Sequence, residues 1–98
     1  MATYDQAIRS KSVVLVEFYA TWCPHCQAMA PVVEEVSEIL GDSAAVLQLD
    51  VDKNKEAADA EEVEATPTFI LYKEGRQIWR HEGEIDGNAL LQKVQSVL

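Results

Sequence analysis

The chain has 98 residues, 48% hydrophobic and 26% charged, as expected for one globular domain spanning residues 1–98. Its 17 acidic and 8 basic residues give a net charge of −9, which argues against binding to nucleic acid or to an anionic membrane, since both need a basic surface. We find neither a signal-peptide core near the N-terminus nor a membrane span, so we expect a cytoplasmic protein.

The first half of the chain alternates helix-like and strand-like segments. Residues 3–10 are a short helical candidate, and residues 13–19 ("VVLVEFY") form an apolar, β-branched run typical of a strand covered on both faces. Residues 24–40 place apolar side chains at helical spacing and are followed by a glycine, which predicts a helix with a kink at Pro31.

The second half predicts a strand at 46–50, a polar helix at 53–63, and a hairpin of 68–72 with 77–82. Parallel strands with a crossover helix, followed by a hairpin, predict an α/β fold with helices on both faces of a mixed sheet. Asp86 is suited to cap the last helix. The predicted buried stripe of that helix is Leu90, Leu91, Val94, Val97 and Leu98.

The only two cysteines lie in the sequence "WCPHC", three residues apart at the predicted start of a helix. This spacing places them on one helical face, within reach of a disulfide. Pro24 suits the first helical position, so Cys23 lies where free N–H groups and the helix dipole favour its thiolate. We expect Cys23 to be exposed with a low pKa and Cys26 to be buried, the arrangement that thiol–disulfide exchange needs.

Two other interpretations of the cysteine pair stay open. A structural disulfide closing so short a loop would constrain the unfolded chain little. A zinc site normally needs four ligands, and besides the two cysteines the only candidates of suitable type are His25 and His81. Because His25 lies between the cysteines and is not expected to point inward with both sulfurs, redox exchange is favoured over both.

The chain resembles the thioredoxin family along nearly its whole length. The matching features are residues 17–23 ("EFYATWC"), Cys26 three residues after Cys23, Pro31, the tripeptide Thr66-Pro67-Thr68, Gly75 and Gly83. The resemblance implies a thioredoxin fold, with Cys23 as the nucleophile and Cys26 as the resolving thiol. Family members usually begin with a strand before the first helix. Only about a dozen residues precede Val13, so we expect four strands without that N-terminal strand, and residues 46–50 at an edge.

The resemblance also implies a substrate-binding surface around the dithiol. Pro67 matches the cis-proline of the family, which faces the cysteines and helps to keep metals off them. The backbone of Thr66 is expected to pair with a substrate strand. Trp22 and Gly83 are expected to form the apolar rim of this surface together with residues 65–67. The resemblance implies no metal and no cofactor beyond the redox-active Cys23–Cys26 disulfide.

Glu17 is a carboxylate within an apolar strand, where burial would raise its pKa. An exposed glutamate at the strand end is the alternative. The resemblance favours burial, because the family usually has a buried aspartate at this position that exchanges protons with the buried cysteine through water. It therefore implies that Glu17 is the proton acceptor for Cys26. Near this acid the family often has a lysine, where this chain has Gln48.

The dipeptide between the cysteines departs from the family. Most thioredoxins have Gly-Pro there, whereas Pro24-His25 is the dipeptide of a strongly oxidising periplasmic relative. We expect His25 to donate to, or pair with, the Cys23 thiolate and so to raise the redox potential, while the net charge of −9 and Glu17 oppose this. We therefore predict a potential between those of the two relatives. The alternative is a solvent-facing His25 with no effect.

These features predict a monomeric protein thiol–disulfide oxidoreductase that reduces disulfides in substrate proteins. A thioredoxin reductase-type electron donor, linked to NADPH or ferredoxin, is expected to recycle it. The alternatives are a disulfide oxidase or isomerase, which runs the same exchange in the other direction, and a redox-inactive binding module with a thioredoxin fold.

Overall fold

The apolar run at residues 13–19 forms strand β1 (Val13–Tyr19) in the computed structural model, which describes residues 3–98. The sheet has the strand order β2-β1-β3-β4, with β2 (Ala45–Asp50), β3 (Thr68–Lys73) and β4 (Arg76–Glu82). Strand β1 pairs in parallel with β2 and antiparallel with β3, which pairs antiparallel with β4. The predicted four-stranded mixed sheet, with β2 at an edge, is confirmed.

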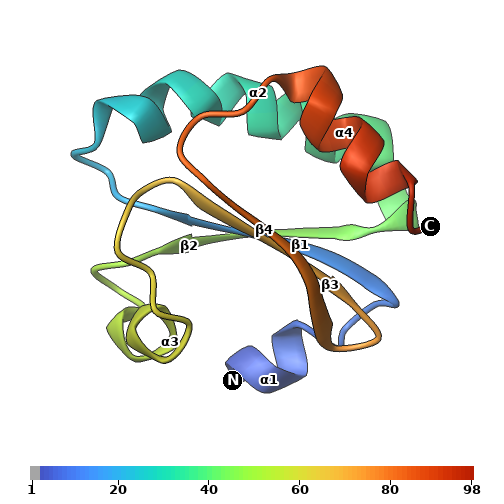
Figure 1. The fold of residues 1–98 in the computed structure, drawn as a ribbon, viewed down its shortest axis with the longest axis horizontal. Helices are drawn as coiled ribbons and strands as arrows, with labels where there is room; N and C mark the ends of the chain where they lie inside the picture. Colours follow the sequence, from blue (N-terminus) through green and yellow to red (C-terminus); the bar gives the residue numbers. More distant parts are fainter. Residues whose placement is uncertain (1–2) are drawn as a thin grey trace.

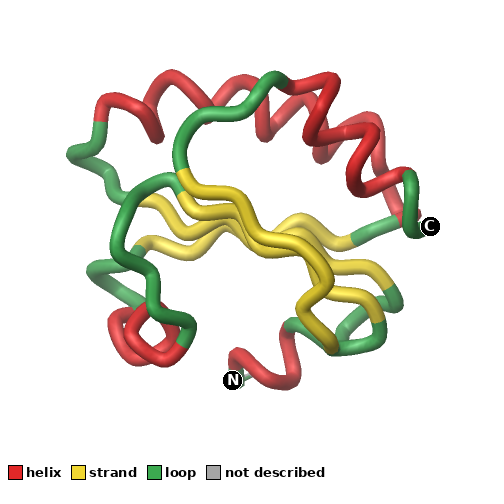
Figure 2. The backbone as a smooth tube through the Cα atoms, in the orientation of Figure 1, coloured by secondary structure: helices red, strands yellow, loops and turns green. Residues whose placement is uncertain are grey.

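Helices cover both faces of this sheet (Figure 1). Helices α2 (Pro24–Leu40) and α4 (Gly87–Gln95) lie on one face, and α1 (Tyr4–Ala7) and α3 (Lys55–Ala60) lie on the other (Figure 2). Helix α2 continues through Pro31 and is followed by a 3₁₀ turn, η1 (Gly41–Ser43). Within the described part of the chain, no helix is long and apolar enough to cross a membrane.

The helices on the α1/α3 face are shorter than predicted. Helix α1 begins with a capping box, in which Thr3 and Gln6 exchange side-chain-to-backbone hydrogen bonds, and it ends after one turn. Helix α3 ends before Glu62, whose positive φ of 55° leaves the helical region. Arg80 donates hydrogen bonds to the carbonyls of Glu61 and Glu62 at 2.6 and 2.9 Å. These hydrogen bonds provide donors for the carbonyl groups at the end of α3, and the spacing of apolar residues in the sequence does not predict them.

The core lies on both sides of β1, whose first six residues are all buried. On the α2/α4 face, Leu15 and Phe69 pack with Leu90 in one cluster. On the other face, Phe18 and Ile70 belong to a second cluster. Because alternate residues of a strand point to opposite faces, this two-sided burial explains the continuous apolar run.

The predicted stripe of the last helix is only partly correct. Leu90 and Val94 are buried, but Leu98 is 54% exposed. Helix α4 begins after Asp86, whose side chain accepts a hydrogen bond from the Ala89 N–H as predicted, and it ends at Gln95. Leu98 therefore lies beyond the helical repeat that would place it on the sheet.

A tight two-residue turn joins β3 to β4. Glu74 and Gly75 both have positive φ, of 51° and 76°, as in the turns that match the twist of a hairpin. A Cβ atom on Gly75 would lie 2.9 Å from the Arg9 side chain, so both the conformation and the space favour glycine there.

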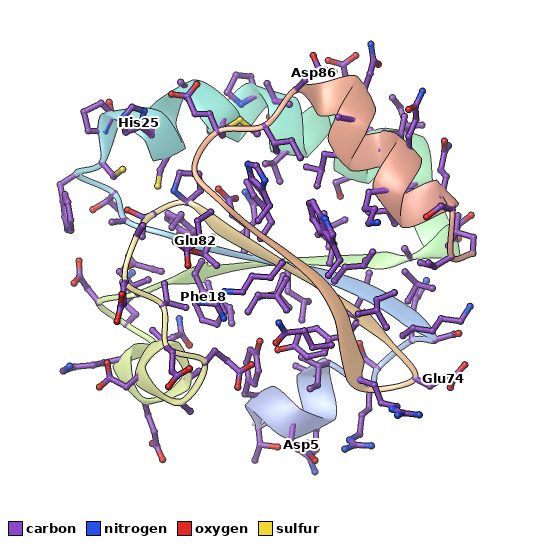
Figure 3. The ribbon with its side chains drawn as sticks, viewed as in Figure 1. Asp5, Phe18, His25, Glu74, Glu82 and Asp86 are labelled. Atoms are coloured by element: carbon purple, nitrogen blue, oxygen red, sulfur yellow. The ribbon has the colours of Figure 1, made fainter. Side chains whose placement is uncertain are left out.

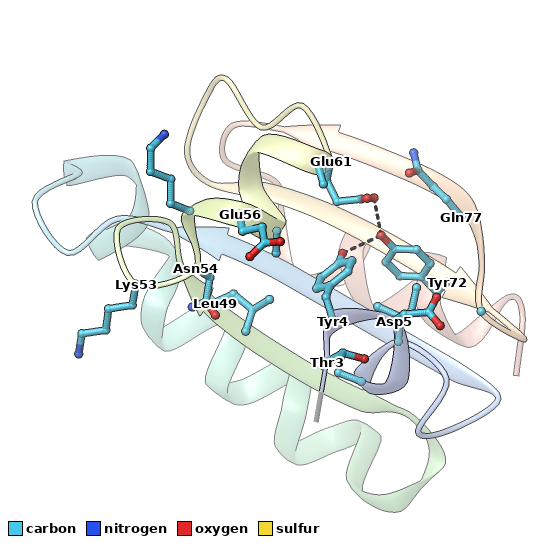
Figure 4. A pocket seen from close by; sticks show the side chains of 16 residues that line it. Thr3, Tyr4, Asp5, Leu49, Lys53, Asn54, Glu56, Glu61, Tyr72 and Gln77 are labelled. Carbon is cyan, nitrogen blue, oxygen red and sulfur yellow. Dashed lines mark hydrogen bonds between the residues drawn. The ribbon is translucent and has the colours of Figure 1, made fainter. Parts of the chain in front are cut away.

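A hollow of about 850 Å³ lies between α1 and α3 (Figure 4). In its wall, the hydroxyl groups of Tyr4 and Tyr72 are hydrogen bonded at 2.7 Å, and Tyr72 donates to Glu61 at 2.8 Å. This hollow is on the sheet face opposite α2, so it is separate from the two cysteines.

Candidate active site

The two cysteines lie at the start of α2, as predicted. Cys23 is the N-cap residue, with extended backbone angles (φ −88°, ψ 118°), and Pro24 is the first residue of the helix. The ring of Pro24 is preorganised for this position, where its missing N–H removes no helical hydrogen bond. The Gln27 N–H then donates to the Cys23 carbonyl at 3.0 Å, which closes the first turn. The Cys23 side chain consequently lies at the positive end of a 17-residue helix.

Both cysteines are free thiols, and both are buried. Cys23 is 6% exposed and Cys26 5% exposed, so the predicted contrast between an exposed attacking thiol and a shielded resolving thiol is wrong. The reason is tertiary: the loop containing Thr66 lies over Cys23, whose thiol donates to the Thr66 carbonyl at 3.4 Å. On the other side, Cys26 Sγ accepts a hydrogen bond from the Ala20 N–H at 3.5 Å.

The environments of the two sulfurs shift their pKa values in opposite directions. Hydrogen bonding of the Thr66 side chain, followed by the Cys26 N–H, lowers the pKa of the Cys23 thiol to about 7. The contact with the Thr66 carbonyl acts against this lowering, because only the protonated thiol can donate. Desolvation by burial raises the pKa of Cys26. The two thiols thus differ in acidity rather than in exposure.

The loop over the cysteines contains a cis peptide bond between Thr66 and Pro67. Two hydrogen bonds hold this loop: the Gly83 N–H donates to the Pro67 carbonyl at 2.8 Å, and the Thr68 hydroxyl donates to the Ala65 carbonyl at 2.6 Å. Gly83 has a positive φ of 90°. These contacts join the segment after β4 to the cis-proline loop, close to Cys23.

Trp22, one of the predicted rim residues, has 67% of its surface exposed. Its indole Nε1 donates to Asp52 Oδ2 at 3.0 Å, which ties the residue before the dithiol to the loop after β2. Asp52 was missed at the sequence level, because nothing in the sequence pattern links it to Trp22 across 30 positions.

Glu17 is buried, with 1% of its surface exposed, so the alternative of an exposed strand-end glutamate is wrong. Its side chain has the same strand parity as Leu15 and therefore points to the face covered by α2. Burial raises the pKa of Glu17, and a 3.1 Å hydrogen bond from Gln48 Nε2 to its Oε1 acts in the opposite direction. Gln48 lies directly opposite Glu17 in the register of β1 and β2.

His25 is in the first turn of α2 (Figure 3), and its ring bonds to a carboxylate that the sequence did not point to. Its Nδ1 lies 2.6 Å from Glu84 Oε2, and the two side chains are 67% and 48% exposed. Hydrogen bonding and charge interaction with Glu84 raise the pKa of His25. His25 thus faces solvent, as in the alternative prediction, but it has a carboxylate partner, and its effect on the redox potential stays a prediction. Glu84 is 59 positions away, so only the fold brings it to the dithiol.

The geometry agrees with the comparison to known proteins. A family model described as Thioredoxin matches residues 1–96 of the chain. The chain belongs to the thioredoxin family. Members of this family are thiol–disulfide oxidoreductases, and the fold expected from the resemblance is confirmed.

Three relatives illustrate the thioredoxin likeness. Thioredoxin Y of rice (Oryza sativa subsp. japonica), which is named chloroplastic, is 43% identical over 98 residues, covering 99% of this chain and 58% of the relative. A thioredoxin-like protein of Synechocystis is 40% identical over 86 residues, covering 88% of this chain and 82% of that protein. The solved structure of a mutant thioredoxin from Halobacterium salinarum superposes with a TM-score of 0.86 at 39% identity, covering 95% of this chain and 80% of that chain. This thioredoxin-family chain therefore spans little more than half of the rice relative.

A metal site was the second alternative for the cysteines of this thioredoxin-family chain. Among residues 3–98, no group of three or more His, Cys, Asp or Glu side chains is arranged to hold a metal ion. His81, the other histidine considered, has its Nε2 3.0 Å from the Glu84 carbonyl. It is therefore engaged away from the sulfurs.

Proposed function

We propose that the chain is a protein thiol–disulfide oxidoreductase that reduces disulfides in substrate proteins through Cys23 and Cys26. The observation that carries this proposal is the pair of unlike thiols: the pKa of Cys23 is lowered to about 7 at a helix N-terminus, while burial raises that of Cys26. A thiolate present at neutral pH attacks, and a thiol kept protonated waits for the second step. We further propose that residues 1–98 act as a single domain.

In the first step, the Cys23 thiolate attacks one sulfur of the substrate disulfide. A mixed disulfide forms, the substrate S–S bond breaks, and the first substrate thiolate leaves. Cys26 then loses its proton and attacks the Cys23 sulfur, which releases the second substrate thiolate. Two electrons have moved to the substrate, and the protein holds a Cys23–Cys26 disulfide. A thioredoxin reductase-type donor, linked to NADPH or ferredoxin, reduces this disulfide again.

Glu17 is the proposed proton acceptor for Cys26. Its buried carboxylate faces the α2 side of the sheet. Burial raises the pKa of Glu17, which brings it closer to the pKa of a thiol than that of an exposed glutamate and makes it a better proton acceptor for Cys26. The hydrogen bond from Gln48 favours the ionised form of Glu17, which is the form that can accept a proton.

The proposed substrate surface lies around Cys23. The backbone of Thr66 is offered to an extended substrate segment, as in β-augmentation, beside the cis-proline Pro67. Trp22 supplies an exposed aromatic face on one side, and Gly83, with open space where a Cβ would lie, supplies the other. The predictions of a cytoplasmic monomer that binds neither nucleic acid nor membrane stay predictions.

The direction of electron flow is the finer part of the proposal. Pro24 and His25 favour a potential above that of ordinary thioredoxins, which would bring the oxidase or isomerase alternative closer. In a glutathione titration we expect an intermediate value, and a potential of about −270 mV or lower would contradict it.

Insulin reduction in the presence of dithiothreitol tests the activity. We expect the wild-type chain to accelerate insulin precipitation, and Cys23→Ser to abolish this, because no attacking thiolate is left. Cys26→Ser is expected to accumulate the mixed disulfide, which mass spectrometry detects. A wild-type chain that gives no acceleration would favour the redox-inactive binding module instead.

A further inference from the structure

The histidine between the cysteines has a bonding partner that the proposed function does not use. His25 Nδ1 is 2.6 Å from Glu84 Oε2, within the range of charge-assisted hydrogen bonds. The Cys23 thiol instead donates a hydrogen bond to the Thr66 carbonyl, at 3.4 Å. In the described part of the chain, no hydrogen bond joins the His25 ring to that sulfur. The hydrogen bond of the His25 ring is therefore the one with Glu84.

The backbone of Glu84 is held in place independently of His25. The residue before it, Gly83, donates its N–H to the Pro67 carbonyl at 2.8 Å. The Glu84 carbonyl accepts from His81 Nε2 at 3.0 Å, and the His81 ring stacks on Trp79 with ring centroids 5.9 Å apart. The carboxylate therefore projects from a segment whose backbone is held by contacts that do not involve His25.

We propose that Glu84 is a positioning residue of the redox site, whose carboxylate binds the His25 imidazolium and holds it toward the segment after β4, away from the Cys23 sulfur. This inference rests on the proposed function, because it concerns how strongly His25 stabilises the attacking thiolate. An imidazolium paired with a carboxylate projects a weaker field on a neighbouring anion than a free imidazolium does. Glu84 thereby moderates the oxidising character that the dipeptide Pro24-His25 would otherwise confer.

The acid–base behaviour of the site is consistent with this role. The groups that lower the pKa of Cys23 are Thr66, the backbone N–H and the side chain of Cys26, and the backbone N–H of His25; the His25 ring is not among them. The charged or titratable groups that act on His25 are Glu84 and Cys23, with Glu84 the larger influence. The Glu84 carboxylate and the Cys23 thiolate thus compete for the positive charge of the His25 imidazolium.

The test measures alkylation of reduced protein by iodoacetamide at pH 5.5, with the first modification followed by mass spectrometry. At this pH, below the ordinary imidazole pKa of about 6.5, His25 is charged with or without Glu84, so the rate reports where its charge lies. Glu84→Gln frees the imidazolium for the Cys23 thiolate, and we expect alkylation to be roughly 1.5- to 5-fold faster. A rate that is unchanged or slower would overturn the proposal.

Glu82→Gln is the matched control. It removes the same charge two positions earlier, from a side chain 52% exposed whose ion-pair partner is Arg80 at 3.8 Å. We expect a clearly smaller increase in rate, because Glu82 does not hold His25. Equal effects of the two substitutions would mean that Glu84 acts only as one negative charge among several, which overturns the positioning role.

The same two substitutions in a His25→Gln background complete the test. There, Glu84→Gln is expected to have no larger effect than Glu82→Gln, because no imidazolium is left to release. An equally large gain in both backgrounds would contradict action through His25. In addition, an NMR titration should show that the His25 pKa falls in Glu84→Gln and not in Glu82→Gln, and an unchanged pKa would overturn the proposal.

Failure of this inference and failure of the proposed function give different results. If the wild-type chain does not reduce insulin, the proposed activity is wrong, yet the alkylation rates and the imidazole titration still report on the Glu84–His25 pair. If the wild-type chain is active and Glu84→Gln behaves as Glu82→Gln does, only the positioning role is wrong.

Discussion

Gln48 Nε2 donates a 3.1 Å hydrogen bond to Oε1 of Glu17, a carboxylate buried under the helix that carries Cys26. The two residues lie opposite each other on neighbouring parallel strands. The bond favours the ionised carboxylate, while burial, the larger of the two effects, favours the protonated form and raises the pKa of Glu17. A buried acid in this condition is suited to accept and return a proton, and it has consequences for both rate and stability.

Glu17→Gln is expected to slow the resolution of the mixed disulfide, because Cys26 loses its proposed proton acceptor. A loss of roughly 10²-fold would correspond to general-base action. Stopped-flow fluorescence with a disulfide substrate separates this step from the first attack, which is expected to keep its rate. An unchanged resolution rate would remove Glu17 from the mechanism.

The same substitution is expected to change stability in a pH-dependent way. Burial raises the folded-state pKa of Glu17 above its ordinary 4.5, so its contribution to stability is fully present below pH 4.5 and is lost as the pH rises through the folded value. Glu17→Gln should therefore increase the free energy of unfolding at neutral pH, by about 1.4 kcal/mol for each unit of pKa difference, and by little at low pH. Urea unfolding at several pH values measures this. A pH-independent difference would mean that the pKa of Glu17 is not raised in the folded state.

The reactivity of Cys23 should follow its acidity. We expect the rate of the first alkylation by iodoacetamide to rise with pH about a midpoint near 7, since the thiolate is the reactive form. Cys26 should react only at higher pH, because burial raises its pKa. Mass spectrometry of quenched samples resolves the two events. A first midpoint at the ordinary cysteine value of about 8.5 would show that the helix N-terminus does not activate Cys23.

Trp22→Ala should weaken binding of protein substrates more than it affects chemistry. Removing an exposed aromatic anchor at the edge of the docking surface is expected to raise KM for insulin roughly five- to tenfold, with kcat little changed. Ile39→Ala is the matched control, because Ile39 is 55% exposed and lies near the other end of α2. An equal effect of both substitutions would mean that Trp22 is not a specific contact.

Tyr72→Phe tests the hydrogen-bonded wall of the hollow on the opposite face of the sheet. It removes the 2.7 Å bond with Tyr4 and the 2.8 Å bond to Glu61, so we expect a loss of about 1–3 kcal/mol in the free energy of unfolding. Tyr19→Phe serves as the control, because its hydroxyl makes no hydrogen bond to the described residues. Denaturant unfolding distinguishes the two, and insulin reduction should be unaffected by Tyr72→Phe, since Tyr72 is on the face away from α2.

Elements and chemistry that depend on local spacing could be predicted from the sequence. The strand at 13–19, the helix at 24–40 and the capping role of Asp86 were all correct, because periodicity and caps are properties of neighbouring residues. The length of α3 was not, because its end is held by hydrogen bonds from the distant Arg80, and α1 also ends earlier than its pattern predicts.

By itself, the sequence determined the dithiol, its place at a helix N-terminus and the four-stranded sheet, because these follow from spacing and from the pattern of buried strands. Only the tertiary structure decided that Cys23 is covered, that Gln48 bonds to Glu17, and that Glu84 holds His25. Burial and charge pairing are set by residues distant in the chain, and their partners are defined only when the sheet and helices have packed.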